Sequence, residues 1–439
     1  MPEGGARTSR HDAAVEERAG YLELMRANVN FRRLWAGSVV SLLGDWFNTI
    51  ALYVLVVDLT GSPLALGGVF ITKMIPWALV SPLAGALTDR YSRRRLMIGA
   101  DLVRAVVVLG FLLIDAAAEV PWLYALIAAQ VVVSAVFQPA KSAALPNITT
   151  PRELLTANAL LSATWSTMLA VGAALGGLAA EALGLEAVFL IDSATYLVSA
   201  GFIWGTVIPQ EKGETDPSSL VRSAAREIVD GWRHLRAHPR IGRIAFAKAT
   251  WAVAGGGLVY MVALLGDEVA PGAMAAGVGI LFMARGIGTG LGPIVARAVF
   301  TRAKHWPAVL GACIAACGAG YVAVSYAPWL QAAASVAVLC VLIGAAHAAS
   351  GANWVLATVL LQKRTPDRFR GRVFGTEWML VMTTEAVSIL AASLLLEQGL
   401  LELRPTLRLF GLLQVGCGAF WILLVVPRER RAAAEERRA

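Results

Sequence analysis

The chain has 439 residues, of which 57% are hydrophobic and only 15% are charged. A soluble chain of this length would be nearer half apolar and about a quarter charged, so the composition excludes an ordinary soluble protein and indicates a lipid environment. The net charge of +8 comes from basic residues that lie between apolar stretches. Because they do not gather in a polar domain, they favour a membrane protein over a nucleic-acid-binding protein.

Residues 1–33 are polar, and the first apolar run begins near Leu34 without a convincing signal-peptide cleavage site. A bilayer core of about 30 Å requires roughly 20 apolar residues per helix. The runs lack the alternation of membrane strands, which excludes a barrel and predicts an all-α membrane protein. Twelve transmembrane helices are predicted, at about 34–58, 64–88, 95–114, 121–143, 158–181, 186–207, 243–266, 275–297, 307–326, 329–357, 372–396 and 405–427.

The loops between these runs differ in charge. The loops after runs 1, 3, 5, 7 and 9 contain no Lys or Arg, and the loop after run 11 contains only Arg404. The positive-inside rule therefore predicts a protein of the cytoplasmic membrane with both termini in the cytoplasm. Basic residues follow the even-numbered runs, at Arg90 and 93–95, at Lys141 and Arg152, in the central segment, at Arg302 and Lys304, and from 363 to 372.

The longest connection, at about 208–242, divides the runs into two groups of six. Val221, Ile228, Trp232 and Leu235 share one face of a helix there, which either lies on the cytoplasmic membrane surface or packs beneath the bundles. A second surface helix is expected within residues 12–30, after about ten disordered residues. The expected organisation is a cytoplasmic segment 1–33, a six-helix bundle 34–207, the linker 208–242, a second bundle 243–427 and a charged tail 428–439.

Two six-helix halves predict an internal repeat, and traces of one are visible. GALTDR at the end of run 2 has a counterpart in GPIVAR at the end of run 8, where Gly292 and Arg297 match Gly85 and Arg90. LPNITTPREL after run 4 likewise has a counterpart in LLQKRTPDRF after run 10. Ala296 occupies the position that matches Asp89, so the second copy lacks the acid.

The segment GALTDRYSRRR resembles the signature of the major facilitator superfamily between the second and third helices, G-x-x-x-D-R-x-G-R-R. Ser92 stands where that signature usually has glycine. The matching residues are Gly85, Asp89, Arg90, Arg93 and Arg94.

VGAALGG resembles the fifth-helix antiporter signature G-P-x-x-G-G of the same superfamily through Gly172, Gly176 and Gly177, with Ala173 in place of proline. NFRRLWAGSVVSLLGDWFNTIAL and TPDRFRGRVFG are similar to segments of its drug- and siderophore-exporter branch, which includes enterobactin exporters and macrolide efflux pumps. The resemblance implies two six-helix bundles and alternating access without ATP hydrolysis. The sequence agrees with the absence of ATP hydrolysis, since it has no GxxxxGK[ST] phosphate-binding loop.

Ionisable side chains within the runs are candidate sites, because each costs about 3 kcal/mol to insert. Asp45, near the middle of run 1, is either a proton or cationic-substrate site or a hydrogen-bonded acid that fixes packing beside Gly44. Arg285 and Glu385, near mid-depth of runs 8 and 11, either face a central cavity or form a structural ion pair.

Lys73 in run 2 is a further cavity candidate, and Glu377, nearer the cytoplasmic end of run 11, is a candidate gate residue. Asp101 and Arg104 lie three residues apart, a spacing that predicts an ion pair within one helix. His347 is expected to be packed and hydrogen-bonded. The four cysteines lie inside apolar runs, so no disulfide and no metal site is expected.

The acid of GALTDRYSRRR requires its own explanation, because positive-inside bias does not call for an acid. We expect Asp89 to cap the start of run 11, GRVFG, near Arg370 or Arg372. That contact would join the two bundles on the cytoplasmic side and favour the outward-open state.

The favoured function is a secondary transporter, a proton antiporter that exports an amphipathic drug, siderophore or secondary metabolite. The alternatives are an importer or lipid flippase on the same fold, and a non-transporting membrane sensor or scaffold. An enzyme is disfavoured, because the sequence has no metal-ligand cluster, nucleophile–base spacing or cofactor loop. The expected partners are the substrate, protons and the lipid bilayer, with no cofactor, no nucleic acid and a monomeric chain.

Overall fold

The computed structural model describes residues 19–210, 220–300, 305–327, 332–366 and 369–435. Within these ranges the side chains at 81–83, 85, 86, 89, 220–227, 332–334 and 433 are not described. The expectations of disorder in the first ten residues and of basic loop residues at Arg302 and Lys304 therefore fall outside the described residues.

Twelve helices in the described ranges are long and apolar enough to cross a membrane, as predicted. Six of them form the N-terminal bundle: α2 (Val29–Thr60), α3 (Pro63–Arg90), α4 (Arg93–Leu109), α5 (Val120–Ile148), α6 (Pro151–Leu183) and α7 (Leu185–Trp204). The other six form the C-terminal bundle: α9 (Pro239–Val269), α10 (Met274–Val299), α11 (Trp306–Tyr326), α12 (Ala332–Arg364), α13 (Arg370–Glu397) and α14 (Leu403–Phe420). Short helices η1 (Gly110–Leu113) and η2 (Ala117–Glu119) join α4 to α5, and the π-helical turn η7 (Trp421–Val425) extends α14.

Several helices are longer than the apolar runs that predicted them, because they continue past the hydrocarbon core. Lys141 was expected in a loop after run 4, but it lies inside α5, which ends at Ile148. At other ends the local sequence sets the boundary. Gly61 adopts φ 60 at the C-cap of α2, and the Ser62 side chain accepts a hydrogen bond from Ala65 at the start of α3.

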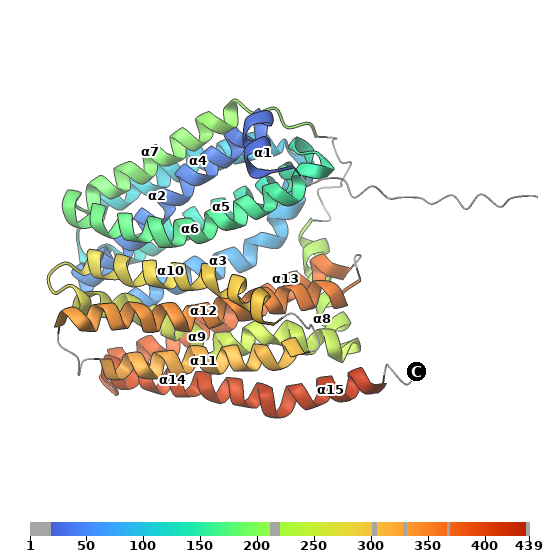
Figure 1. Ribbon diagram of the computed structural model, residues 1–439. Helices are drawn as coiled ribbons and strands as arrows, with labels where there is room; N and C mark the ends of the chain where they lie inside the picture. Colours follow the sequence, from blue (N-terminus) through green and yellow to red (C-terminus); the bar gives the residue numbers. More distant parts are fainter. Residues whose placement is uncertain (1–18, 211–219, 301–304, 328–331, 367–368, 436–439) are drawn as a thin grey trace, which may run out of the picture.

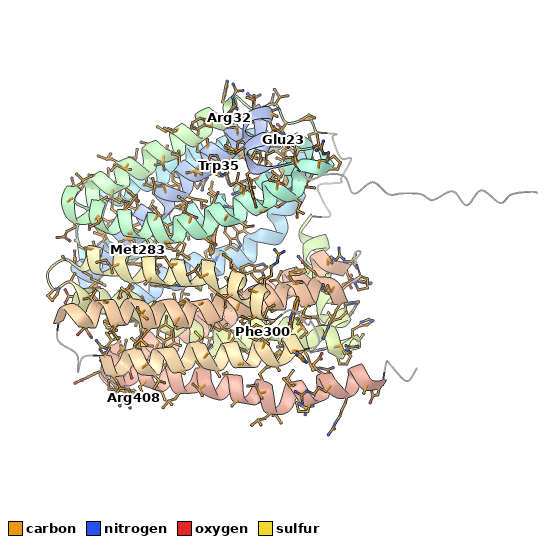
Figure 2. All side chains as sticks on the ribbon, viewed as in Figure 1. Glu23, Arg32, Trp35, Met283, Phe300 and Arg408 are labelled. Carbon is orange, nitrogen blue, oxygen red and sulfur yellow. The ribbon has the colours of Figure 1, made fainter. Side chains whose placement is uncertain are left out.

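The two bundles lie side by side along their length (Figure 1), with α2, α3 and α6 facing α9, α10 and α13. Side chains fill the space between helices of each bundle (Figure 2), as where Trp35 donates to Thr164 at 2.9 Å. We call the end that carries the loops after α3, α5, α7, α10 and α12 the basic end. The opposite end, with Asp58, Glu181 and Asp267, is the acidic end.

Small residues bring α6 and α10 into contact across the bundle interface. Gly177 packs against the backbone of Ala275 and Gly279, and a Cβ at Gly286 would lie 2.6 Å from the backbone of Ala170. Larger side chains at these positions would push the bundles apart. This contact separates the interior from a groove of about 500 Å³ at the acidic end, which Ala275 lines together with Asp58 and Asp267.

Polar contacts also join the bundles at the acidic end. Glu397 at the end of α13 accepts hydrogen bonds from the Ser62 hydroxyl at 2.7 Å and the Leu64 amide at 3.1 Å. The carboxylate therefore caps the positive N-terminus of α3 in the other bundle. Tyr260 on α9 donates to the Pro63 carbonyl at 2.7 Å.

The linker contains α8 (Leu220–Ala237), which packs on α13 at the basic end. Gly231 lies against the Arg372 carbonyl and the Thr376 hydroxyl, and Leu235 is buried. These contacts favour the second interpretation of the linker, a helix packed beneath the bundles.

Near the N-terminus, only α1 (Tyr21–Ala27) falls in the described part of the expected surface helix. It docks on the bundle, since Thr156 of α6 donates to the Ala19 carbonyl at 2.7 Å.

The predicted charged tail is an ordered helix, α15 (Val426–Glu435), that is partly built into the C-terminal bundle. Glu429 is only 4% exposed and forms ion pairs with Arg243 of α9 at 2.6 Å and Arg364 of α12 at 2.7 Å. Two arginines around one carboxylate satisfy a charge that would otherwise be costly to bury.

Candidate functional site

A cavity of about 240 Å³ lies between the two bundles. The N-terminal bundle contributes residues of α2 and α3, and the C-terminal bundle contributes residues of α9, α10 and α13. The lining residues are Trp46, Thr49, Tyr53, Phe70, Lys73 and Met74 from the first bundle, and Trp251, Gly256, Val259, Phe282, Arg285 and Glu385 from the second.

Three charged side chains line this cavity. Lys73, Arg285 and Glu385 were each predicted as cavity candidates, and the structure brings all three together. Lys73 donates to the Thr49 hydroxyl at 2.6 Å. The alternative prediction of an ion pair between Arg285 and Glu385 is wrong: none joins them, although both side chains are described. The Arg285 guanidinium instead lies over the Phe282 ring, 5.4 Å from its centroid.

Aromatic rings form most of the apolar wall. Tyr53 stacks on Phe70 with 4.4 Å between ring centroids, and Trp46 of α2 lies 6.3 Å from Phe282 of α10 across the bundle interface. Such a wall suits an apolar ligand body, because rings offer large rigid contact areas.

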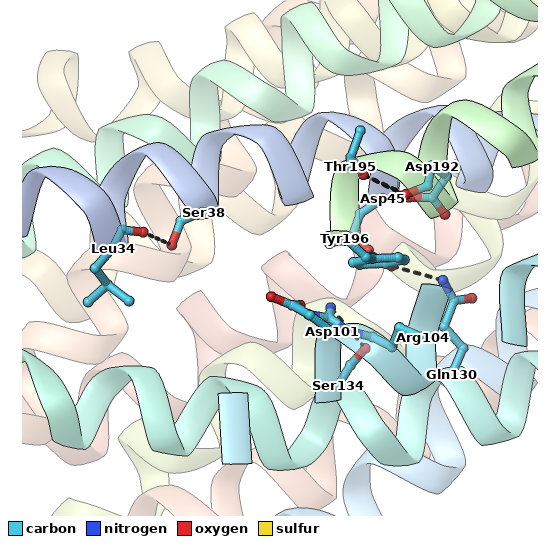
Figure 3. Close-up of polar contacts among 10 residues, drawn as sticks. All are labelled: Leu34, Ser38, Asp45, Asp101, Arg104, Gln130, Ser134, Asp192, Thr195 and Tyr196. Carbon is cyan, nitrogen blue, oxygen red and sulfur yellow. Dashed lines mark hydrogen bonds and ion pairs between the residues drawn. The ribbon is translucent and has the colours of Figure 1, made fainter. Parts of the chain in front are cut away.

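Asp45 lies behind the cavity in a buried polar network of the N-terminal bundle (Figure 3). Tyr196 of α7 donates its hydroxyl hydrogen to Asp45, and the same hydroxyl accepts from Gln130 at 3.0 Å. The predicted local pair of Asp101 and Arg104 is present, and the Arg104 guanidinium lies 4.3 Å from the centroid of the Tyr196 ring. Both interpretations of Asp45 remain compatible with these contacts.

The sequence analysis missed a second acid, Asp192 on α7. It is fully buried and lies beside Asp45 (Figure 3), at the point where Gly44 lets α2 approach α7. Thr195 donates to the Asp192 carbonyl at 2.7 Å, whereas the Oδ2 atom of the acid has no hydrogen-bond partner in the described part of the chain. A lone acid in the apolar run 186–207 was the signal that could have identified it.

Glu377 forms a buried ion pair with Lys248 of α9, with 3.1 Å between Lys248 Nζ and Glu377 Oε1. The Lys248 ammonium also lies 5.0 Å from the ring centroid of Trp354, which contacts Trp251 and Trp378 edge-on. The two charges therefore neutralise each other within the C-terminal bundle. Lys248 was missed, although a lone Lys in the run 243–266 was visible.

The arginines of GALTDRYSRRR bind the C-terminal ends of neighbouring helices. Arg93 donates to the Ala143 carbonyl at 2.9 Å and to Asn147 of α5 at 3.1 Å, and Arg94 donates to the Trp204 carbonyl at the end of α7. Cations at helix C-termini are stabilising, so these residues fix helix ends as well as topology. Arg90 lies over the ring of Tyr91.

The expected contact of Asp89 with Arg370 or Arg372 lies outside the described residues, because the Asp89 side chain is not described. Arg372 has a partner that the sequence did not predict: its Nη1 lies 3.6 Å from Asp230 of α8. Arg370 begins α13. Ala296, at the position that matches Asp89 in the second copy, is packed in the core of the C-terminal bundle.

The glycines of VGAALGG allow close helix packing. Gly172 and Gly176 lie against Trp46 and Phe47 of α2, and Gly177 faces α10 across the interface.

Elsewhere, His347 is buried and bonded to the Tyr321 hydroxyl at 2.7 Å, in agreement with its expected structural role. The described residues contain no cluster of His, Cys, Asp and Glu that could hold a metal ion.

Two six-helix membrane bundles around a cavity with charged and aromatic walls define a multi-pass membrane transporter. The Major Facilitator Superfamily profile matches residues 34–392, and the chain belongs to that superfamily. It is therefore a secondary transporter of a small molecule and not an enzyme.

Similar proteins include a Bacillus subtilis transporter, the uncharacterized MFS-type transporter YfiS, which is 26% identical over 49% of this chain and 51% of its own length. The putative bacilysin exporter BacE of Bacillus amyloliquefaciens is 27% identical over 53% of this chain and 57% of its own. Macrolide efflux protein A of Streptococcus pyogenes is 35% identical over 18% of this chain and 19% of its own. The chain thus matches about half or less of the length of these relatives.

Among solved structures, a bacterial homolog of the human lysosomal transporter Spinster, in an inward-facing and unoccupied conformation, superposes with a TM-score of 0.69. The superposition covers 92% of this chain and 98% of the homolog, at 15% sequence identity. At this identity the likeness confirms the fold.

Proposed function

We propose that this transporter exports an amphipathic small molecule across the cytoplasmic membrane by alternating access, driven by proton antiport. The observation that carries the proposal is the cavity between the bundles, which combines an aromatic wall with Lys73, Arg285 and Glu385. The macrolide efflux and putative bacilysin exporter relatives support the direction of transport.

The proposal places the basic end and both termini in the cytoplasm, following the positive-inside rule. The acidic end, where α6 contacts α10 and Glu397 caps α3, then faces outward. With that end held together, the structure corresponds to an inward-facing state. The moving units are the bundles 34–207 and 243–427 joined by the linker 208–242, and a monomer suffices because one chain supplies the whole cavity wall.

Protons would bind at Asp45 and Asp192. Asp192 is fully buried beside Asp45, and two ionised carboxylates side by side would repel each other, so this pair is the candidate for exchanging a proton. Lys73 lines the cavity and donates to Thr49, which follows Asp45 by one turn of α2. Proton release and substrate binding can therefore influence each other electrostatically.

Everted membrane vesicles from an efflux-deficient host test the proposal. Vesicles made acidic inside and supplied with a labelled macrolide, a labelled dipeptide antibiotic and a labelled amphipathic anion should accumulate at least one of them, and a protonophore should release it. Flux in the opposite direction would indicate an importer. A folded, inserted protein that moves neither these compounds nor labelled lipid would indicate a sensor or scaffold.

A further inference from the structure

A second cavity, of about 270 Å³, lies within the N-terminal bundle and shares α2 and α3 with the central one. Leu42 and Trp77 line the second cavity, while Trp46 and Lys73, each four residues away, line the central one. Residues four apart lie on the same face of a helix, so the two cavities follow one another along the same faces of α2 and α3. The other lining residues are Ser38, Gln138, Lys141, Leu161 and Trp165.

The two cavities have a common chemistry. Each has a lysine in an aromatic wall: Lys141 with Trp77 and Trp165 in the second, and Lys73 with Trp46 and Tyr53 in the central cavity. Trp165 is 49% exposed, so this wall residue of the second cavity also reaches the surface of the bundle.

Positive charge exceeds negative charge along both walls. Lys141, Lys73 and Arg285 line the cavities, against a single acid, Glu385. None of the three cations forms an ion pair with a carboxylate in the described part of the chain. Of the acids behind the wall, Asp101 is paired with Arg104 and Asp45 accepts from Tyr196, whereas the Oδ2 atom of Asp192 has no hydrogen-bond partner in the described part of the chain.

Unpaired cations in a low-dielectric wall favour an anionic ligand, because that ligand supplies the missing counter-charge. We infer that the substrate is an amphipathic organic anion, with an apolar, ring-containing body and one acidic group. That group would meet Lys141 in the second cavity and then Lys73 and Arg285 in the central one. The assignment rests on the proposed function for transport, but ligand binding tests it independently of transport.

Equilibrium binding to the purified full chain in phosphatidylcholine nanodiscs tests this inference. Three probes share a naphthyl body: naphthylacetate, its uncharged amide and naphthylethylamine. We expect naphthylacetate to bind at least about tenfold more tightly than the amide, which corresponds to about 1.4 kcal/mol, and more tightly still than the amine. Equal affinities, or tighter binding of the amine, would overturn the inference.

Variants test which cation in each cavity is responsible for binding the anionic probe. Lys73→Met and Arg285→Gln should remove the preference for the anion in the central cavity, whereas Lys73→Arg and Arg285→Lys should keep it. Lys141→Met should abolish a second, separable binding event. Lys363→Met is the matched control, because Lys363 lies over the aromatic ring of Trp306, as Lys73 lies over that of Tyr53, but lines neither cavity. A preference unchanged in the neutral variants, or lost equally in the control, would contradict the assignment.

Repeating the measurement in phosphatidylglycerol nanodiscs distinguishes a soluble anion from an anionic lipid. Unchanged affinity for naphthylacetate supports the soluble substrate, and its complete displacement would overturn that assignment in favour of a lipid. The vesicle assay distinguishes failure of this inference from failure of the proposed function. Import of an anion would contradict the direction of transport but not the anionic class, and export of an amine would contradict the anionic class but not the direction.

Discussion

Tyr196 on α7 donates a hydrogen bond to Asp45 on α2, a residue 151 positions earlier in the chain. The same hydroxyl accepts from Gln130 of α5, so three helices determine the surroundings of one acid. Because Tyr196 is fully buried, its hydroxyl has no alternative partner in water. The N-terminal bundle thus holds Asp45 in one place while leaving it close to the cavity.

Asp45→Asn and Asp192→Asn should each reduce proton-driven transport to background while leaving substrate exchange without a gradient intact. Neither amide can carry the proton that couples the two fluxes. Tyr196→Phe should weaken coupling less, since it removes one hydrogen bond to a charged group, worth about 1.5–3 kcal/mol. Uptake into vesicles with and without a pH gradient measures the difference. Asp115→Asn, in an exposed loop, is the control. Full coupling in both the Asp45 and the Asp192 variant would exclude this acid pair as the proton site.

Lys248→Met and Glu377→Met should each destabilise the protein by about 3–5 kcal/mol, because either change leaves one charge buried without its partner. The double variant should regain most of that loss, since it leaves no charge behind. Thermal unfolding in detergent of the four proteins forms a double-mutant cycle. If the two losses simply add, the pair is not the stabilising unit that the 3.1 Å separation indicates.

Glu429→Gln should loosen α15 from the C-terminal bundle, because a neutral amide cannot hold both Arg243 and Arg364. Trypsin should then cleave faster after Arg428, Arg430 or Arg431, as measured by mass spectrometry of the released tail. The comparison is Glu435→Gln, an exposed acid on the same helix. Equal cleavage rates in the two variants would show that the ion pairs do not hold the helix in place.

Asp89→Asn should reduce transport without lowering the amount of inserted, folded protein, if Asp89 joins the bundles at the start of α13. Loss of the acid would remove the proposed contact with Arg370 or Arg372, which we expect to form when the basic end closes. Asp230→Asn should have little effect, because its pair with Arg372 is about 40% exposed and such pairs contribute about 0–1 kcal/mol. Flux per folded molecule is the measurement. Normal flux in Asp89→Asn would leave the segment with a topological role alone.

Much of the fold was predictable because membrane insertion depends on local sequence. Each helix satisfies its own backbone hydrogen bonds, so an apolar run of sufficient length predicts a span wherever it occurs in the chain. Errors arose at helix ends, as with Lys141, because a helix continues past the membrane where its capping residues allow it.

The candidate site was predictable only in part. Lone charges in apolar runs identified Asp45, Lys73, Arg285 and Glu385, because each is costly in lipid and requires a reason. Their partners were not predictable, since Asp192 and Lys248 contact residues more than a hundred positions away. The choice between a cavity position and an ion pair for Arg285 and Glu385 likewise depended on helices far apart in the chain.

The sequence by itself determined twelve helices, the two groups of six and the charge difference between the ends, all of which depend on the order of residues along the chain. Tertiary structure decided which charges are paired inside a bundle and which line a cavity. That choice depends on which helix faces approach each other, and small residues such as Gly44 and Gly177 set those approaches. The ion pair of Lys248 with Glu377 and the unpaired Lys73 and Arg285 follow from the same packing.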